Sequence, residues 1–226
     1  MGEIMKNIKI IDKLNITEEG LISLDDIDKK SQKVFLKQGD ADGACGLYCT
    51  FMALLICGAT TREKLVEVNL NENGSLTPLM NSFKKFSPLF KEGTTTFDLS
   101  KAIKKNFKED ITFTPKEEIN SNLIDILKEE LLNDNPMIVG VIFPSGIGHW
   151  VLAVGMEYTI SSNQNINVNK IFVLDSLGEE PKYSYWNQVI IVGKNQNSYK
   201  WLTREDNVEG YFSIRLDEGI TIEDKK

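Results

Sequence analysis

A cysteine and a histidine are the residues of this chain whose chemistry combines most directly. Cys45 opens a long apolar run, and His149 is the only histidine. The thiolate is the reactive form of cysteine, and an imidazole held beside the thiol can take up its proton. The two residues together predict a thiol nucleophile with a histidine base, which is the machinery of acyl transfer.

Two further residues could complete such a site. Gln38 precedes Cys45, and its amide N–H could donate a hydrogen bond to a developing oxyanion. Asp175 ends the apolar run of residues 171–174, and a carboxylate can hold an imidazole in one tautomer. Asn187 is the rival for this last role, because an amide can hold the same tautomer. The order Gln, Cys, His, Asp predicts an enzyme with a cysteine nucleophile.

The three cysteines are interpreted differently. Free cysteine is often a buried core residue, but Cys45 follows a glycine-rich acidic turn and starts the apolar run, where the positive end of a helix would stabilise an anion. Cys49 and Cys57 lie further inside the run and are predicted to be core residues. Paired Cys-x-x-Cys ligands and further histidines are missing, so we predict no metal site. The sequence indicates no cofactor.

Composition limits the classes of function. The chain has 226 residues, of which 41% are hydrophobic and 26% are charged. This length and composition are typical of one large globular domain. A net charge of −7 argues against nucleic acid or an anionic membrane surface as the main partner. We find neither the roughly 20 apolar residues of a membrane span nor the apolar core of a signal peptide. The odd cysteine count favours a reducing compartment, so we expect the cytoplasm or delivery without a cleaved signal peptide.

Hydrophobic periodicity divides the chain into a helical front half and a strand-rich back half. Helices are predicted over residues 45–57, 61–70, 78–90, 97–107 and 117–132. Strands are predicted over residues 137–143, 150–158, 168–175, 189–192 and 211–216. This pattern predicts an α+β fold, with an N-terminal arm or pro-region over residues 1–30, a catalytic domain over residues 31–217 and an acidic tail over residues 218–226.

With these residues in this order, the chain resembles the papain-like cysteine peptidases, most closely the bacterial C39-like group. The resemblance rests on residues 38–49, 148–155 and 171–176. It implies a papain-like fold, in which a helical N-terminal half with a central nucleophile helix packs on a C-terminal antiparallel sheet. It also implies that Gln38 is the oxyanion glutamine, Cys45 the nucleophile, His149 the general base and Asp175 the orienting acid.

Two features depart from related patterns. Six residues separate Gln38 from Cys45, one more than the family usually has, so the turn around Asp40 must absorb the extra residue. Residues 42–45 are also similar to the Asp-Gly-x-Cys of ovarian-tumour-type deubiquitinases. Those enzymes commonly carry an acid two residues before the histidine, where this chain has Ile147. The C39-like interpretation is therefore the better one.

The resemblance implies cleavage of a peptide or isopeptide bond in a protein or peptide substrate. Two alternatives stay open at this stage. The same residues could act on a glutamine side chain, as in deamidase or transglutaminase-type effectors and toxins, because that reaction also passes through a thioester. An inactive papain-like domain could instead bind a peptide in its cleft. The oligomeric state is not encoded in any pattern that we recognise.

Overall fold

The computed structural model describes residues 5–24, 31–39, 43–67, 94–107, 111–117, 123–194, 196–205 and 208–225. The predicted helix over residues 78–90 lies outside these ranges, as does most of the acidic turn between Gln38 and Cys45. The three cysteines, His149 and Asp175 all lie within them.

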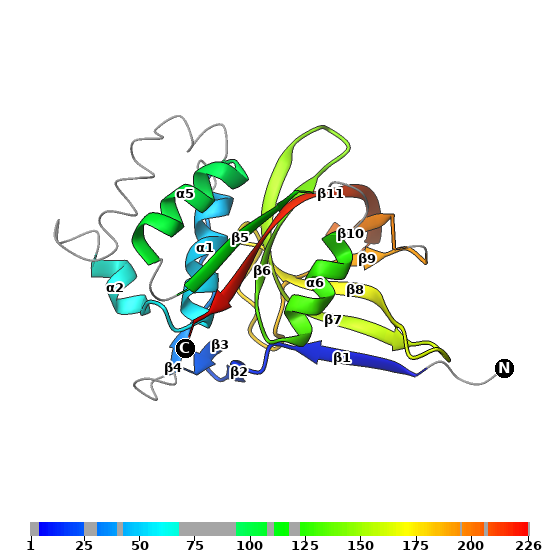
Figure 1. The fold of residues 1–226 in the computed structure, drawn as a ribbon, viewed down its shortest axis with the longest axis horizontal. Helices are drawn as coiled ribbons and strands as arrows, with labels where there is room; N and C mark the ends of the chain where they lie inside the picture. The colour runs from blue at the N-terminus through cyan, green and yellow to red at the C-terminus, as the bar shows by residue number, and fades with distance from the viewer. Residues whose placement is uncertain are drawn as a thin grey trace.

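Six antiparallel strands close into a barrel (Figure 1). They are β6 (Met137–Ile142), β7 (Gly148–Ile160), β8 (Ile166–Leu174), β9 (Gln188–Val192), β10 (Tyr199–Glu205) and β11 (Val208–Asp224). The pairing order is β7-β6-β11-β10-β9-β8, and β8 pairs again with β7, which closes the ring. The β-branched and aromatic residues of these strands suit a surface buried on its inner face.

Further strands extend the barrel because two of its members are long. β7 pairs with β6 along its first half and with β1 (Lys6–Ile10) along its second half. β11 pairs with β10 and β6, and its last residues pair with β5 (Ile111–Glu117). A separate three-stranded sheet is formed by β2 (Leu14–Thr17), β3 (Gly20–Leu24) and β4 (Ser31–Lys33).

The predicted fold class is therefore wrong. Strands account for 45% and helices for 22% of the structure, and a closed barrel replaces the helical N-terminal half packed on a C-terminal sheet. The N-terminal strands were not predicted as strands because none exceeds five residues, and in β1 lysine and asparagine interrupt the isoleucines. Closure escaped prediction because it depends on which strands pair at the two ends of the sheet, and hydrophobic periodicity does not encode that choice.

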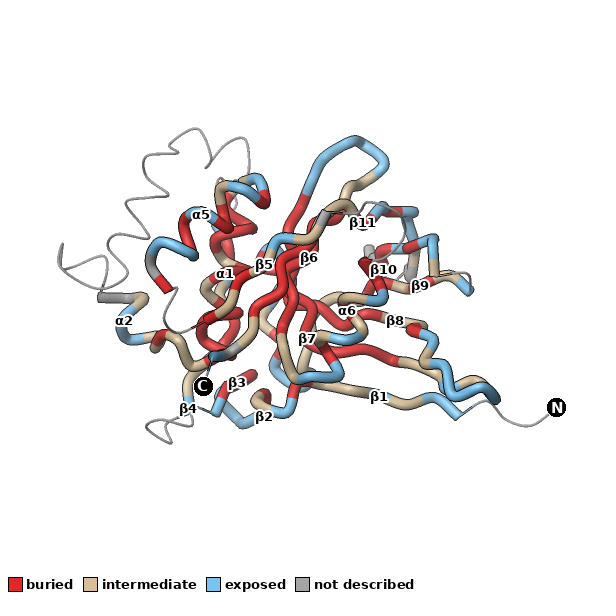
Figure 2. The backbone as a smooth tube through the Cα atoms, in the orientation of Figure 1, coloured by how far each residue is buried: buried red, intermediate tan, exposed pale blue. Residues whose placement is uncertain are grey.

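The central helix of the prediction is present. α1 (Cys45–Ile56) is buried on nearly all sides and packs against β6 and β7 (Figure 2). Gly58 follows the helix with a φ of 67°, a left-handed conformation that glycine adopts at helix C-termini without strain. Cys49 is fully buried and Cys57 nearly so, which confirms their prediction as core residues.

The other described helices agree in part with the predictions. They are α2 (Arg62–Glu67), α5 (Thr96–Phe107) and α6 (Leu123–Leu132). At the start of α5, the Thr95 hydroxyl accepts from the Asp98 N–H at 3.2 Å, and the Asp98 carboxylate accepts from the Thr95 N–H at 3.3 Å, which is a reciprocal cap. None of the described helices is long and apolar enough to cross a membrane.

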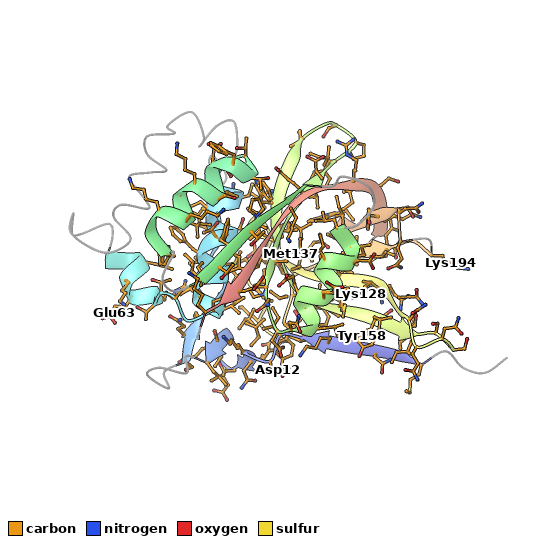
Figure 3. All side chains as sticks on the ribbon, in the orientation of Figure 1. Asp12, Glu63, Lys128, Met137, Tyr158 and Lys194 are labelled. Atoms are coloured by element: carbon orange, nitrogen blue, oxygen red, sulfur yellow. The ribbon has the colours of Figure 1, made fainter. Side chains whose placement is uncertain are left out.

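The two ends of the chain carry strands. β11 continues to Asp224, so residues 218–224 of the predicted tail lie in the barrel sheet, where Ile220 and Ile222 are fully buried. β1 lies within the predicted arm and pairs with β7. In Figure 3, Met137 of β6 points into the interior, whereas Glu63, Asp12 and Lys194 lie at the periphery of the molecule.

Candidate active site

Cys45 is the first residue of α1, so its thiol lies at the positive end of the helix. No acidic residue occupies the first turn, and no side chain caps it. The backbone N–H groups of a first helical turn have no partners within the helix and favour a nearby anion. The Cys45 side chain is almost completely buried. The thiol therefore lies at the end of the helix toward which its unpaired N–H groups point, and out of bulk water.

His149 lies near the start of β7 and links the thiol to a carboxylate. Its Nε2 atom is 2.8 Å from Oδ1 of Asp175, which directly follows β8. The Cys45 thiol lies within hydrogen-bonding reach of the same imidazole. Because Nε2 is engaged by Asp175, Nδ1 is the ring nitrogen left for the thiol. The pairing of β7 with β8 and the packing of α1 against β7 bring the three residues together.

The surroundings of His149 favour its protonated form. Burial lowers the pKa of His149, but the hydrogen bonds to Asp175 and Cys45 and the charges of these groups outweigh burial and raise the pKa from 6.5 to about 9. The imidazole is therefore positively charged at neutral pH. A positive imidazole beside a thiol favours a thiolate–imidazolium pair, which is the form in which a cysteine nucleophile reacts.

This shift makes folding stability depend on pH. Because the pKa of His149 is raised in the folded state, its stabilising contribution is complete below about pH 6.5 and is lost as pH rises through about 9. We expect the free energy of unfolding, measured with urea across this range, to fall as the pH increases. Asp175→Asn removes the carboxylate that raises the pKa, so the fall should become smaller. An equal fall in the free energy of unfolding of both proteins would contradict the claim that Asp175 raises the pKa of His149.

Asp175 is held in place by several hydrogen bonds. Its Oδ1 also accepts from the Leu177 N–H at 2.9 Å. Its backbone N–H donates to Asn187 Oδ1 at 2.8 Å, and Asn187 Nδ2 donates back to the Asp175 carbonyl at 2.7 Å and to the Glu179 carbonyl at 3.0 Å. Of the two candidates for orienting the imidazole, Asp175 is therefore the one whose side chain bonds His149. Asn187, considered as its rival, instead braces the Asp175 backbone.

Gln38 lies beside the residue that follows Asp175. Its N–H donates to the Ser176 carbonyl at 2.8 Å, and its side-chain Oε1 accepts from the Ser176 hydroxyl at 3.0 Å. Both side chains are buried. The bond at Oε1 fixes the orientation of the amide and directs Nε2 away from Ser176. Its role as the oxyanion donor stays a prediction, because the turn between Gln38 and Cys45 is not described.

Substitution of Gln38 tests that role. Gln38→Ala should lower the chemical step by about 10²–10³, the range for losing one oxyanion donor, with little change in substrate binding. Ser176→Ala is the matched control, since it removes the bond at Oε1 but leaves the amide in the chain. The single-turnover rate reports the chemical step, and the affinity for substrate reports binding. A Gln38→Ala protein with the full chemical rate would show that other N–H groups hold the oxyanion.

A small cavity of about 150 Å³ opens onto the thiol and the imidazole. Its other walls include Thr94, Gly140, Trp150, Asp217 and Glu218. The Trp150 indole N–H donates to the Thr94 carbonyl at 2.8 Å, which fixes this wall beside α1. Gly46 of α1 allows Thr94 to lie this close to the helix, because a Cβ atom at position 46 would lie 2.3 Å from Thr94 Oγ1.

Sequence reasoning missed the aromatic residues on the other side of the imidazole. Trp201 of β10 lies edge-on to the His149 ring with centroids 6.4 Å apart, and Phe143 lies 6.4 Å from the same ring. β10 was not predicted as a strand, so nothing placed Trp201 near the site. The alternation of Tyr199, Trp201 and the intervening polar residue was the only available signal.

Cys49 differs from Cys45 although it lies one turn along the same helix. Its thiol donates to the Trp150 carbonyl at 3.3 Å. Burial raises the pKa of the Cys49 thiol well above its ordinary value, and the nearby charges of Cys45 and Asp175 raise it further. Cys49 therefore stays a neutral thiol. Within the described ranges, no three His, Cys, Asp or Glu side chains gather as metal ligands would.

No protein-family model matches the sequence, and no curated protein matches it.

Proposed function

We propose that this protein is a thiol hydrolase that cleaves a peptide or isopeptide bond, with the activity of a papain-like cysteine peptidase. The observation that carries the proposal is the position of His149, whose imidazole bonds the Asp175 carboxylate and lies beside the Cys45 thiol at the same cavity. A nucleophile, a base and an orienting group within hydrogen-bonding reach are the geometric signature of covalent acyl transfer. Burial of all three groups strengthens their electrostatic interactions.

The first half of the reaction forms a thioester. The Cys45 thiolate attacks the scissile carbonyl, and the carbonyl oxygen becomes an oxyanion. The N–H groups at the start of α1 and the amide of Gln38 stabilise that charge. As the tetrahedral intermediate collapses, the carbon–nitrogen bond breaks and the protonated His149 donates its proton to the leaving amine. The raised pKa of His149 suits this role as an acid.

The second half regenerates the enzyme. Water enters where the amine departed, and the now neutral His149 takes a proton from it. The resulting hydroxide attacks the thioester, the carbon–sulfur bond breaks, and Cys45 leaves as a thiolate. Asp175 keeps Nε2 protonated throughout, so that Nδ1 faces the reacting atoms. Asn187 and the Leu177 N–H keep that carboxylate in position.

A peptide library tests the proposal. The protein is incubated with a library of peptides of mixed sequence, and the products are analysed by mass spectrometry beside those of Cys45→Ala. New peptide ends that require Cys45 would support hydrolysis of the peptide bond. A gain in mass at glutamine without cleavage would identify a deamidase instead. Unchanged peptides, together with absent labelling of Cys45 by a thiol-reactive peptide probe, would overturn the enzyme proposal and leave a binding domain.

The compartment is part of the same proposal. Cys45, Cys49 and Cys57 are reduced and form no disulfide in the part of the chain that the structure describes. Free thiols persist in reducing surroundings, which supports the cytoplasm as the place of action. A nucleophilic thiol in particular needs a reducing environment to stay active.

A further inference from the structure

An apolar cavity of about 490 Å³ lies beside the catalytic imidazole. Its walls are formed by Phe143, Ile147, Leu177, Trp201 and Phe212, and it reaches His149. This volume is in the range of cavities that bind ligands, and it is several times that of the cavity on the thiol. The size and the apolar walls indicate a binding site for a hydrophobic group.

The aromatic walls of this cavity pack against one another, and several of its apolar residues are exposed at the surface. Phe143 packs edge-on against Trp201 at 5.4 Å and against Phe212 at 6.2 Å, and Trp201 pairs with Phe212 across β10 and β11. At the rim, Ile147 is 65% exposed, Leu177 53% and Phe212 37%. Large apolar side chains that gather at the surface mark sites that another molecule covers.

The position of the cavity identifies the part of the substrate that would enter it. The small cavity reaches both Cys45 and His149, whereas the apolar cavity reaches His149 and Asp175 but not Cys45. The acyl carbon is bonded to Cys45 during the reaction, and the leaving amine takes its proton from His149. The leaving group therefore lies on the imidazole side of the thiol, where the apolar cavity opens.

On the basis of the proposed function, we infer that this cavity binds a bulky aliphatic or aromatic side chain on the leaving-group side of the scissile bond. Leu177 connects this cavity with the triad, because its N–H donates to the same Asp175 oxygen that bonds His149. Deamidation releases ammonia, which has no side chain to fill such a cavity. The cavity thus favours a peptide with a defined residue after the cleaved bond over a glutamine side chain.

Partitioning of an acyl-enzyme between amines tests this inference without a known substrate. 4-Nitrophenyl acetate acetylates Cys45 and releases 4-nitrophenolate. An added amino-acid amide then attacks the thioester carbonyl, so that a carbon–nitrogen bond forms as the carbon–sulfur bond breaks. The amine proton passes to His149, and Cys45 leaves as a thiolate. The attacking amine enters along the path by which a leaving amine departs, so its preference reports the leaving-group side.

Leucinamide and phenylalaninamide are compared with glycinamide at equal concentration. The ratio of N-acetyl amide to acetate, measured by chromatography with mass detection, should be about tenfold higher for the two bulky amides, which corresponds to about 1.4 kcal/mol. Phe212→Ala and Ile147→Ser should bring this ratio close to that of glycinamide. Both side chains are partly exposed, so both variants should fold. Tyr211→Ala is the matched control, because the neighbouring residue on β11 points to the other face of the strand and should leave the ratio unchanged.

The outcomes separate the inference from the proposed function. If Cys45 is not acetylated, the proposed function fails. If Cys45 is acetylated and hydrolysed but all three amides react equally, the enzyme proposal stands and the cavity is not a leaving-group site. If Tyr211→Ala lowers the ratio as much as Phe212→Ala, the preference arises elsewhere on this face and the inference is also overturned.

Discussion

Replacing Cys45 with alanine should abolish turnover, with a loss of at least ~10⁴-fold in kcat/KM, because no other group supplies the covalent intermediate. The fold should survive, since a short side chain at the first turn of α1 fills little of the core. Product formation from a cleaved peptide, measured at matched protein concentration, gives the loss. Circular dichroism and urea unfolding show whether the variant is folded.

Alkylation of the thiols is an independent test of Cys45 as the nucleophile. Iodoacetamide at neutral pH should modify Cys45 first in the native protein, because Cys49 is fully buried as a neutral thiol. Cys49→Ala is the matched control on the same helix and should keep both labelling and turnover. Equal labelling of the three cysteines, or turnover by the Cys45→Ala protein, would refute the nucleophile assignment.

Replacing His149 with alanine should have the second largest effect, about 10²–10⁴ in the chemical step, the range for loss of general acid–base catalysis. The loss has two parts, since His149 both stabilises the thiolate and protonates the leaving amine. The single-turnover rate with a peptide reports both parts. Labelling by iodoacetamide reports only the first, because no leaving amine is involved.

Asp175→Ala should cost less than His149→Ala, because Asp175 orients the imidazole and does not exchange protons with the substrate. Asn187→Ala should cost less again, since it removes the brace behind Asp175 and not the bond to His149. A silent Asp175→Ala beside an impaired Asn187→Ala would mean that the amide is the true orienting group.

The helix and strands that hold the site were predictable because their sequences are strongly apolar or rich in β-branched residues. The apolar run from Cys45 predicted α1, and β-branched runs predicted most of β6, β7 and β8. These elements hold Cys45, His149 and Asp175. The four-residue order then needed only a known chemical pattern to suggest which residues belong together.

The remaining elements could not be predicted, for physical reasons that differ between them. β5 contains Pro115, which cannot donate to a ladder and usually argues against a strand. Among the described strands β5 pairs with β11 alone, so the proline is tolerated at this edge of the sheet. The meeting of Phe143, Trp201 and Phe212 depends on barrel closure and on the register of β10 with β11. The two hydrogen bonds between the Asn187 side chain and the Asp175 backbone likewise form only once the chain has folded.

The long last strand has a consequence for how the protein is made. β11 pairs with β10 nearby in sequence, but also with β6, whose paired residues precede it by 73 to 84 positions, and with β5, whose paired residues precede it by 101 to 113 positions. Such distant pairings are slow to form, because closing a long loop costs conformational entropy before any stabilising contact is made. On the ribosome, the barrel cannot close until β11 has emerged. Until then the β6 and β5 edges stay open, so we expect nascent chains to need protection from aggregation during synthesis.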